Sequence, residues 1–335
     1  MKGEGTKEER GLSMEIHKRD DKTQGKNEDT NLKVIKKSID HLPKTVLRDL
    51  EKEVSDFMKQ AGFFCRVFSR QNSGASAKKK IDEKKKIKGN NYKMQDLYGV
   101  RIVLYFKDDI PICRKLISEK FKEKEEDASE DIKTSTDFKP TKLNIICPIP
   151  DKIKKHIKSG FWEKCSIDTT FEVQIRTVFS EGWHEIDHDL RYKCKDEWEN
   201  EEDMSRAFNG ILATLETCDW SIISLFDQMA YDKYKDGNWK AMLRNKLRIR
   251  MKNEDLDEEI EKIFSENKQV AKEFYKLERE ELIKAMSSDS LEDVPKSMNN
   301  IVFVANELYV KNEEISALMP NDIRKILKEF MQTMA

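Results

Sequence analysis

The segment FEVQIRT, residues 171–177, does most to limit what this chain can fold into. Successive side chains of an extended strand point to opposite faces, so its apolar residues share one face and Glu172, Gln174 and Arg176 share the other. Two interpretations follow. Alternation alone favours an edge strand with a solvated polar face. A carboxylate, an amide and a guanidinium in one row also make a good floor for a binding site.

A second segment, YKMQDLYGVRIVLYF, favours the binding site. It predicts a strand that Asp96 precedes and that Arg101 interrupts with a charge. If this strand lies beside FEVQIRT, two carboxylates and two arginines converge. Paired carboxylates hold Mg²⁺ together with nucleotide phosphates, and arginine binds phosphate with two parallel hydrogen bonds. The two segments together indicate a metal-dependent phosphate site.

A third segment, SRQNSGASAKKK, adds donors for an anion. Arg70 ends a short strand, and Ser76 and Lys80 lie four residues apart, on one face of the helix that follows. The start of that helix can present backbone N–H groups to an anion. A lysine run taken alone is more typical of a solvated helix face.

The order of elements predicts the fold class. After an opening helix, the pattern runs strand, helix, strand, helix, two strands and a long helix, which indicates an α/β or α+β sheet domain. We expect a flexible charged lead-in over 1–33, the sheet domain over 34–230, and a charged, mostly helical module over 235–335. Within that module, NNIVFVANELYV (299–310) reads as one strand.

Composition excludes several classes of protein. The formal net charge of −1 gives no global basic field for nucleic acid or membrane. The six cysteines form no CxxC pair, and neither a signal-like segment nor an apolar run long enough to cross a bilayer occurs. We expect a cytoplasmic protein without a membrane partner.

The motifs resemble, in order, the synthetase domain of RelA/SpoT-type alarmone enzymes. The resemblance rests on Arg70, Ser76 and Lys80, then DLYGVRIVLYFKDDI, FEVQIRT and WHEIDHDLRYK, and it covers about residues 40 to 195. It implies an α+β fold, with a nucleotidyltransferase-like mixed β-sheet flanked by helices. Neither histidine before residue 45 is followed by the aspartate of the family's hydrolase domain, so we expect a synthetase alone.

The resemblance implies transfer of the β,γ-pyrophosphate of ATP to the 3′-hydroxyl of GTP or GDP, which is (p)ppGpp synthesis. It implies that Asp96 and Glu172 bind Mg²⁺ and that Glu172 also takes the hydroxyl proton. Positioning and charge neutralisation dominate such a reaction. The other expected nucleotide-binding residues are Arg70, Ser76, Lys80, Arg101, Lys139, Gln174, Arg176, His188 and Lys193.

Two positions depart from the family pattern. Asn72 stands where the family commonly has a lysine, which removes one phosphate contact unless the nearby Lys78 or Lys79 supplies it. The family's tyrosine that stacks on the acceptor guanine is absent, and Leu143 falls near its place. Leucine cannot reproduce an aromatic stacking surface. The donor half of the site therefore looks largely intact, and the acceptor stays open.

Other functions remain as alternatives. A toxin-like relative would pyrophosphorylate the end of tRNA, with local lysines meeting the RNA backbone. A non-catalytic nucleotide sensor would lose turnover, although retention of Asp96 and Glu172 argues against it. HEIDH (184–188) formally fits the zinc-peptidase pattern H-E-x-x-H, but no extended third-ligand motif follows it. The sequence leaves homo-oligomerisation open, and the C-terminal module is the candidate for control of activity.

Overall fold

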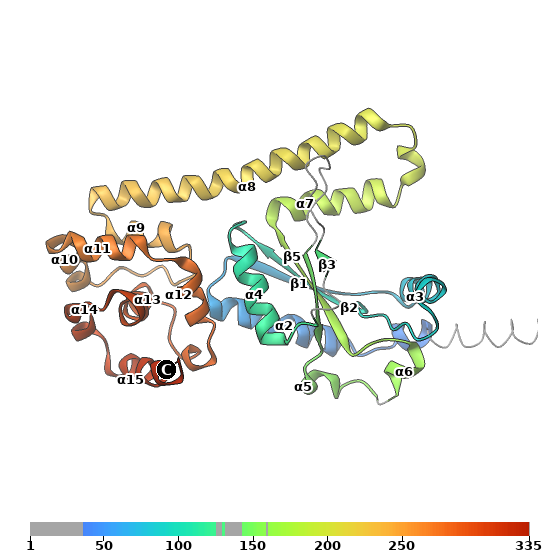
Figure 1. The fold of residues 1–335 in the computed structure, drawn as a ribbon, viewed down its shortest axis with the longest axis horizontal. Coiled ribbons are helices and arrows are strands. Elements are labelled where there is room, and N and C mark those ends of the chain that lie inside the picture. The colour runs from blue at the N-terminus through green and yellow to red at the C-terminus, as the bar shows by residue number, and fades with distance from the viewer. Residues whose placement is uncertain (1–35, 125–128, 131–142, 159, 335) are drawn as a thin grey trace, which may run out of the picture. The chain divides into compact units, whose positions relative to one another are not determined.

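The computed structural model describes residues 36–124, 129–130, 143–158 and 160–334 (Figure 1). Five strands form one sheet in the order β1-β2-β5-β4-β3. They are β1 (Cys65–Gln71), β2 (Tyr98–Leu104), β3 (Ser129–Glu130), β4 (Leu143–Pro148) and β5 (Thr170–Thr177). The expected α+β fold with a mixed sheet is confirmed.

β5 occupies the middle of the sheet, and all eight of its residues are buried. The edge-strand interpretation of FEVQIRT is therefore wrong, and its polar row faces the interior. Alternation could not decide this, because a strand lining a site and a strand facing water show the same pattern.

Strand directions follow from backbone hydrogen bonds. Asn72 N donates to Leu97 O and Tyr105 N donates to Phe64 O, so β1 and β2 are antiparallel. A parallel bridge joins the segments that lead into β2 and β5. β3 and β4 are antiparallel. β2 and β5 therefore run in the same direction.

The described residues divide into two compact units. The first takes in residues up to 48, 70–99 and 149–171, and the second takes in 49–69, 100–148 and 172 onward. The first unit contains a helical segment at 36–40 and the helices α3 (Gly74–Lys88), α5 (Asp151–Lys154) and α6 (Phe161–Cys165). Helix α2 (Lys44–Ala61) spans the boundary and buries Leu50, Val54 and Phe57, as its helical spacing predicts.

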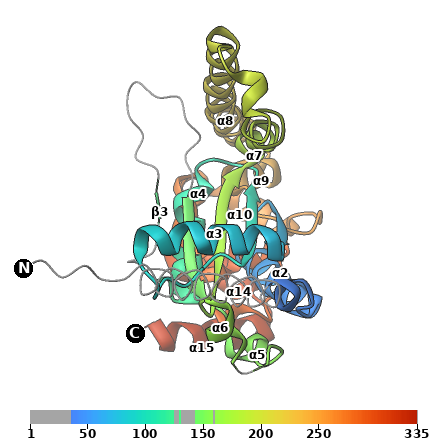
Figure 2. The same cartoon turned by 90° about the vertical axis from the view of Figure 1, so that its right-hand side faces the viewer.

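Helix α7 (Val178–Ile186) begins where β5 ends. Thr177, the last residue of β5, is its N-cap, and a reciprocal bond with the Ser180 side chain completes a capping box. A π-helical turn at 187–192 and a 3-10 turn at 195–198 follow. The 35-residue helix α8 (Glu202–Asp236) then packs against α7 (Figures 1 and 2).

The described residues from 239 onward contain helices and no strand. The helices are α9 (Trp239–Leu247), α10 (Glu258–Glu266), α11 (Lys268–Lys276), α12 (Arg279–Met286), α13 (Met298–Ala305), α14 (Glu313–Leu318) and α15 (Asn321–Met334). The strand expected at 299–310 is wrong. Helix α13 begins after Ser297, whose hydroxyl accepts from Asn300 N. A short apolar run that is buried all round reads alike as a helix or a strand.

A buried ion cluster joins α12 to α4 (Asp109–Phe121), the helix that follows β2. Arg279 Nη2 lies 2.7 Å from Asp109 Oδ1, and Arg279 Nη1 lies 3.0 Å from Asp108 Oδ2. Arg248 also binds Asp108. Burial of Asp109 raises the pKa of its carboxyl to about 6. The C-terminal helices thus belong to the same compact unit as α4.

Among the residues that the structure describes, no helix has both the length and the apolar character needed to cross a bilayer.

Candidate active site

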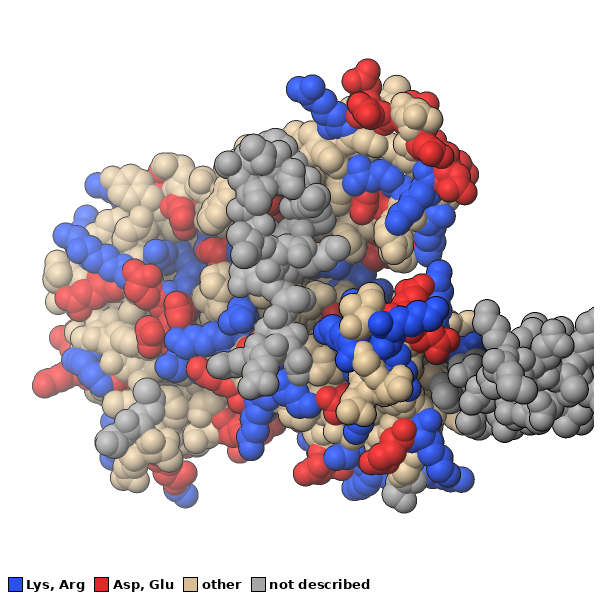
Figure 3. All heavy atoms as spheres, turned by 45° about the vertical axis from the view of Figure 1, so that its right-hand side comes forward, with Lys and Arg blue, Asp and Glu red and all other residues tan. Residues whose placement is uncertain are grey.

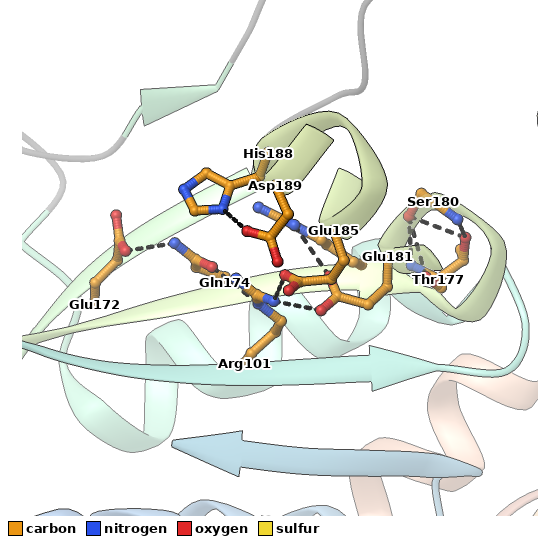
Figure 4. A network of polar contacts seen from close by, with 10 residues as sticks. Arg101, Glu172, Gln174, Thr177, Ser180, Glu181, Glu185, His188 and Asp189 are labelled. Carbon is orange, nitrogen blue, oxygen red and sulfur yellow. Dashed lines mark hydrogen bonds and ion pairs between the residues drawn. The ribbon is translucent and has the colours of Figure 1, made fainter. Parts of the chain in front are cut away.

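Glu172 lies at the centre of the polar row on β5, and its side chain is buried. Gln174 Nε2 donates to its Oε2 at 2.6 Å, and Asn144 Nδ2, from β4, donates to its Oε1 at 2.9 Å. Two amides from two strands therefore fix the carboxylate, and Figure 4 shows the contact from Gln174. An acceptor-only carboxylate held in this way has a set direction before any ligand arrives.

Arg101 extends this row from β2. Its Nε donates to Gln174 Oε1 at 3.1 Å, and its Nη1 binds the carboxylates of Glu181 and Glu185, one turn apart on α7. Burial lowers the pKa of Arg101, but the two glutamates outweigh it and raise that pKa above its ordinary value. The guanidinium is permanently charged and anchored to three acceptors.

Glu181 also binds Arg176, the third polar residue of β5. Arg176 Nη1 lies 3.0 Å from Glu181 Oε2, and the Arg176 side chain is buried. Arg101, Glu172 and Gln174 are thus brought together in one hydrogen-bonded chain (Figure 4), and Glu181 connects Arg176 to it through Arg101.

Lys80 and Asp96 meet in the first unit. Lys80 Nζ binds Asp96 Oδ2, and Asn72 Nδ2 donates to the backbone oxygen of Asp96 at 2.6 Å. Asn72, which departs from the family's lysine, therefore positions the residue expected to bind the metal. Asp96 and Glu172 belong to different compact units, so their pairing at one metal stays a prediction.

The start of α3 is occupied by groups of the chain itself. Gly74 N donates to Asp40 Oδ1 at 2.8 Å, and Ser76 N donates to the hydroxyl of the N-cap Ser73. These two amides are therefore used within the fold. The Ser76 side chain itself is exposed.

Arg70, the penultimate residue of β1, is exposed, and its side chain passes close to Gly99. A Cβ built on Gly99 would lie 3.4 Å from Arg70 Cγ, so the glycine leaves room for the arginine stem. Exposure keeps the Arg70 guanidinium available to a ligand.

His188 and Lys193 lie on the π-helical turn after α7 and at its end. His188 Nδ1 lies 2.9 Å from Asp189 Oδ1, and Lys193 Nζ lies 2.8 Å from the same oxygen. The hydrogen bonds from Lys193 and His188 lower the pKa of Asp189. Figure 4 shows His188 and Asp189 over the face of β5 from which Glu172 and Gln174 project.

Lys139 lies outside the described residues. Leu143, near the place of the family's tyrosine, is the first residue of β4 and is buried.

Mg²⁺ accepts one or two carboxylates together with substrate phosphates. The carboxylates of Asp96 and Glu172 are oxygen groups of this kind. The hydrogen bonds from the amides of Asn144 and Gln174 hold the carboxylate of Glu172 in place. Within the described residues, no three or more His, Cys, Asp or Glu side chains cluster as a metal site. In HEIDH, Glu185 binds Arg101 and His188 binds Asp189.

Sequence reasoning missed Asn144, Glu181 and Glu185. The two glutamates carried a usable signal, because residues four apart share one face of a helix, and this helix starts directly after the arginine of FEVQIRT. Asn144 carried none, since its role depends on which strand neighbours β5.

A family model described as a region found in RelA and SpoT proteins matches residues 69–197. Among solved structures, small alarmone synthetase 1 from Bacillus subtilis shows 18% identity and a TM-score of 0.39, covering 54% of this chain and 91% of that chain. A GTP pyrophosphokinase family protein from Streptococcus pneumoniae shows 17% identity and a TM-score of 0.37, covering 53% of this chain and 85% of that chain. No curated protein sequence matches the chain. Residues 69–197, which run from the end of β1 through the π-helical turn, therefore match the region that RelA and SpoT proteins share.

Proposed function

We propose that this chain is an ATP-dependent pyrophosphokinase that modifies the 3′-hydroxyl of a purine nucleotide, GDP or GTP. One observation carries the proposal. The match to the RelA/SpoT region spans every described candidate residue from Arg70 to Lys193. The chain of hydrogen bonds around Glu172 supports it, because it arranges a carboxylate and two arginines as such a transfer requires.

In this reaction the acceptor 3′-oxygen attacks the β-phosphorus of ATP, the bond from that phosphorus to the α,β-bridging oxygen breaks, and AMP leaves. Glu172, whose carboxylate is held in place by Asn144 and Gln174, takes the proton of the attacking hydroxyl. Bound Mg²⁺, with Asp96 and Glu172 as ligands, would neutralise charge on the phosphates.

The positively charged side chains of the site have two different roles. Arg70 is exposed and Lys80 is half-exposed, and both bind the donor phosphates. Lys80 leaves its ion pair with Asp96 when it binds these phosphates. Arg101 and Arg176 are tied to Glu181 and shape the field around Glu172.

A transfer assay tests the proposal. The chain is incubated with γ-³²P-ATP and Mg²⁺ in the presence of GDP, GTP, ATP or bulk tRNA. We expect label on GDP or GTP, and a loss of about a hundredfold or more in rate for Glu172→Gln. Glu163→Gln, an exposed carboxylate on α6, serves as the matched control and keeps its rate.

Label on tRNA alone would replace the nucleotide acceptor by an RNA end, and no transfer to any acceptor would contradict the proposal. On the face visible in Figure 3, blue and red side chains are mixed over the described residues, so that face offers no single-sign field to RNA.

A further inference from the structure

The acceptor base needs a flat surface, and the position expected from the family cannot provide one. Leu143 is only 6% exposed, and it starts a strand whose side chains pack in the sheet. Neither its shape nor its burial allows contact with a nucleobase. A purine acceptor must therefore stack elsewhere.

Two exposed rings lie close together on the π-helical turn that follows α7. Those of His188 and Tyr192 are parallel within 9°, and their centroids are 6.0 Å apart. Tyr192 is 60% exposed and the His188 side chain 41% exposed. Tyrosine combines a flat apolar ring with a polar hydroxyl, a combination that is enriched at binding surfaces.

We propose that His188 and Tyr192 form the stacking surface for the purine base of the acceptor nucleotide. The inference rests on the proposed function and names the residues that would bind the base of its acceptor nucleotide. Parallel rings suit a flat ligand, because a base stacked on one ring lies parallel to the other as well. The two residues lie four apart on a π-helical turn, a local geometry that is frequent at functional sites.

Charged neighbours complete the surface. Asp189 holds the His188 ring through Nδ1 and is itself bound by Lys193. Lys195 Nζ lies 4.3 Å from the centroid of the Tyr192 ring. An exposed cation–π contact is weak, so a base displaces this ammonium, which then lies beside the acceptor's phosphates.

The location fits the chemistry. Figure 4 shows His188 over the same face of β5 as Glu172, the residue proposed to take the proton of the acceptor hydroxyl. The π-helical turn continues directly from α7, whose Glu181 and Glu185 bind Arg101. A base on the His188–Tyr192 surface would therefore lie on the turn that directly follows the helix whose glutamates bind Arg101.

Steady-state kinetics with separate titrations of GDP and ATP test the inference. Tyr192→Leu should raise the KM for GDP by about 5- to 100-fold, the size of one base–aromatic stack, with the KM for ATP changed less than about twofold. Tyr192→Phe keeps the ring and should behave like the unmodified chain. Tyr231→Leu, on the half-exposed ring of α8, is the matched control and should leave both KM values unchanged.

Calorimetric titration with GDP, which needs no turnover, separates the two proposals. If the unmodified chain labels GDP while Tyr192→Leu keeps its KM for GDP, the stacking surface is wrong and the proposed function stands. If the unmodified chain labels nothing, the proposed function fails. A tenfold or greater loss of GDP affinity in Tyr192→Leu would then still support the surface, whereas unchanged or absent binding would overturn it.

Discussion

The carboxylate of Glu181 binds arginines from two neighbouring strands, one at each oxygen. Arg176 Nη1 of β5 lies 3.0 Å from Oε2, and Arg101 Nη1 of β2 binds Oε1. The Glu181 side chain is 15% exposed, whereas that of Glu185, which also binds Arg101, is 50% exposed. The shielded carboxylate keeps two like charges near each other and fixed in direction.

Glu181→Gln should therefore misplace both arginines and lower kcat/KM for pyrophosphate transfer by about ten- to a hundredfold. Glu185→Gln should lower it by less than about threefold, since Arg101 keeps Glu181 and Gln174. Both variants are compared in the γ-³²P-ATP assay, with melting temperature as a check on folding. Equal losses in the two variants would contradict a special role for Glu181.

The Asp108–Asp109–Arg279 cluster predicts a large effect on stability. Arg279→Gln leaves Asp109 buried without its cation, and the free energy of unfolding should fall by about 3–5 kcal/mol. Lys115→Gln removes an exposed pair with Glu280 between the same two helices and should cost about 1 kcal/mol or less. Denaturant unfolding measures both, and similar losses would show that burial does not decide the strength of these pairs.

Asp109 also predicts a pH dependence. Burial raises the pKa of its carboxyl in the folded chain to about 6, against an ordinary value of 3.8. The folded state therefore binds this proton more tightly than the unfolded state. The resulting stability is fully present below about pH 4 and is lost as pH rises through 6.

Asp109→Asn removes the titrating carboxyl group. As pH falls from 7 to 4, the free energy of unfolding of the original chain should rise relative to that of Asp109→Asn, by at most about 3 kcal/mol. Taking the difference cancels the titration of other carboxylates. A difference that stays flat over this range would show that Asp109 titrates normally.

Gly62 ends α2 with a φ of +87°, and a Cβ there would lie 2.6 Å from Ile249 Cγ2 of the C-terminal part. Gly89 has a φ of +88° and open space around it. Gly62→Ala adds a steric clash to the left-handed strain that Gly89→Ala suffers alone. We expect Gly62→Ala to be less stable than Gly89→Ala by about 1–3 kcal/mol in thermal or denaturant unfolding.

The sequence predicted what depends on local pattern. The strands at β1, β2, β4 and β5 and the helices α2, α4 and α7 appear where periodicity placed them. It could not predict that β5 is central, because neighbours in a sheet are set by tertiary packing. The helix at Met298–Ala305 was misread as a strand for a related reason, since burial on all sides erases the period.

The candidate site divides in the same way. Glu172, Gln174 and Arg176 were identified because alternation puts them in one row, and Arg101 because it interrupts an apolar strand. Their contacts with Asn144 and Glu181 needed the strand order and the start of α7. Tyr192 was missed although it lies four residues from His188, a spacing that puts both rings on one helix face.

The ion cluster at the start of α4 separates two kinds of boundary. Similarity to the family ends at residue 197, yet Asp108 and Asp109, inside that region, depend on Arg248 and Arg279 well beyond it. A fragment cut at the limit of similarity would keep the catalytic motifs and leave Asp108 and Asp109 without the arginines that bind them. A graft of residues 69–197 into another protein should therefore be less stable than the same region in this chain, unless the new surroundings supply equivalent cations.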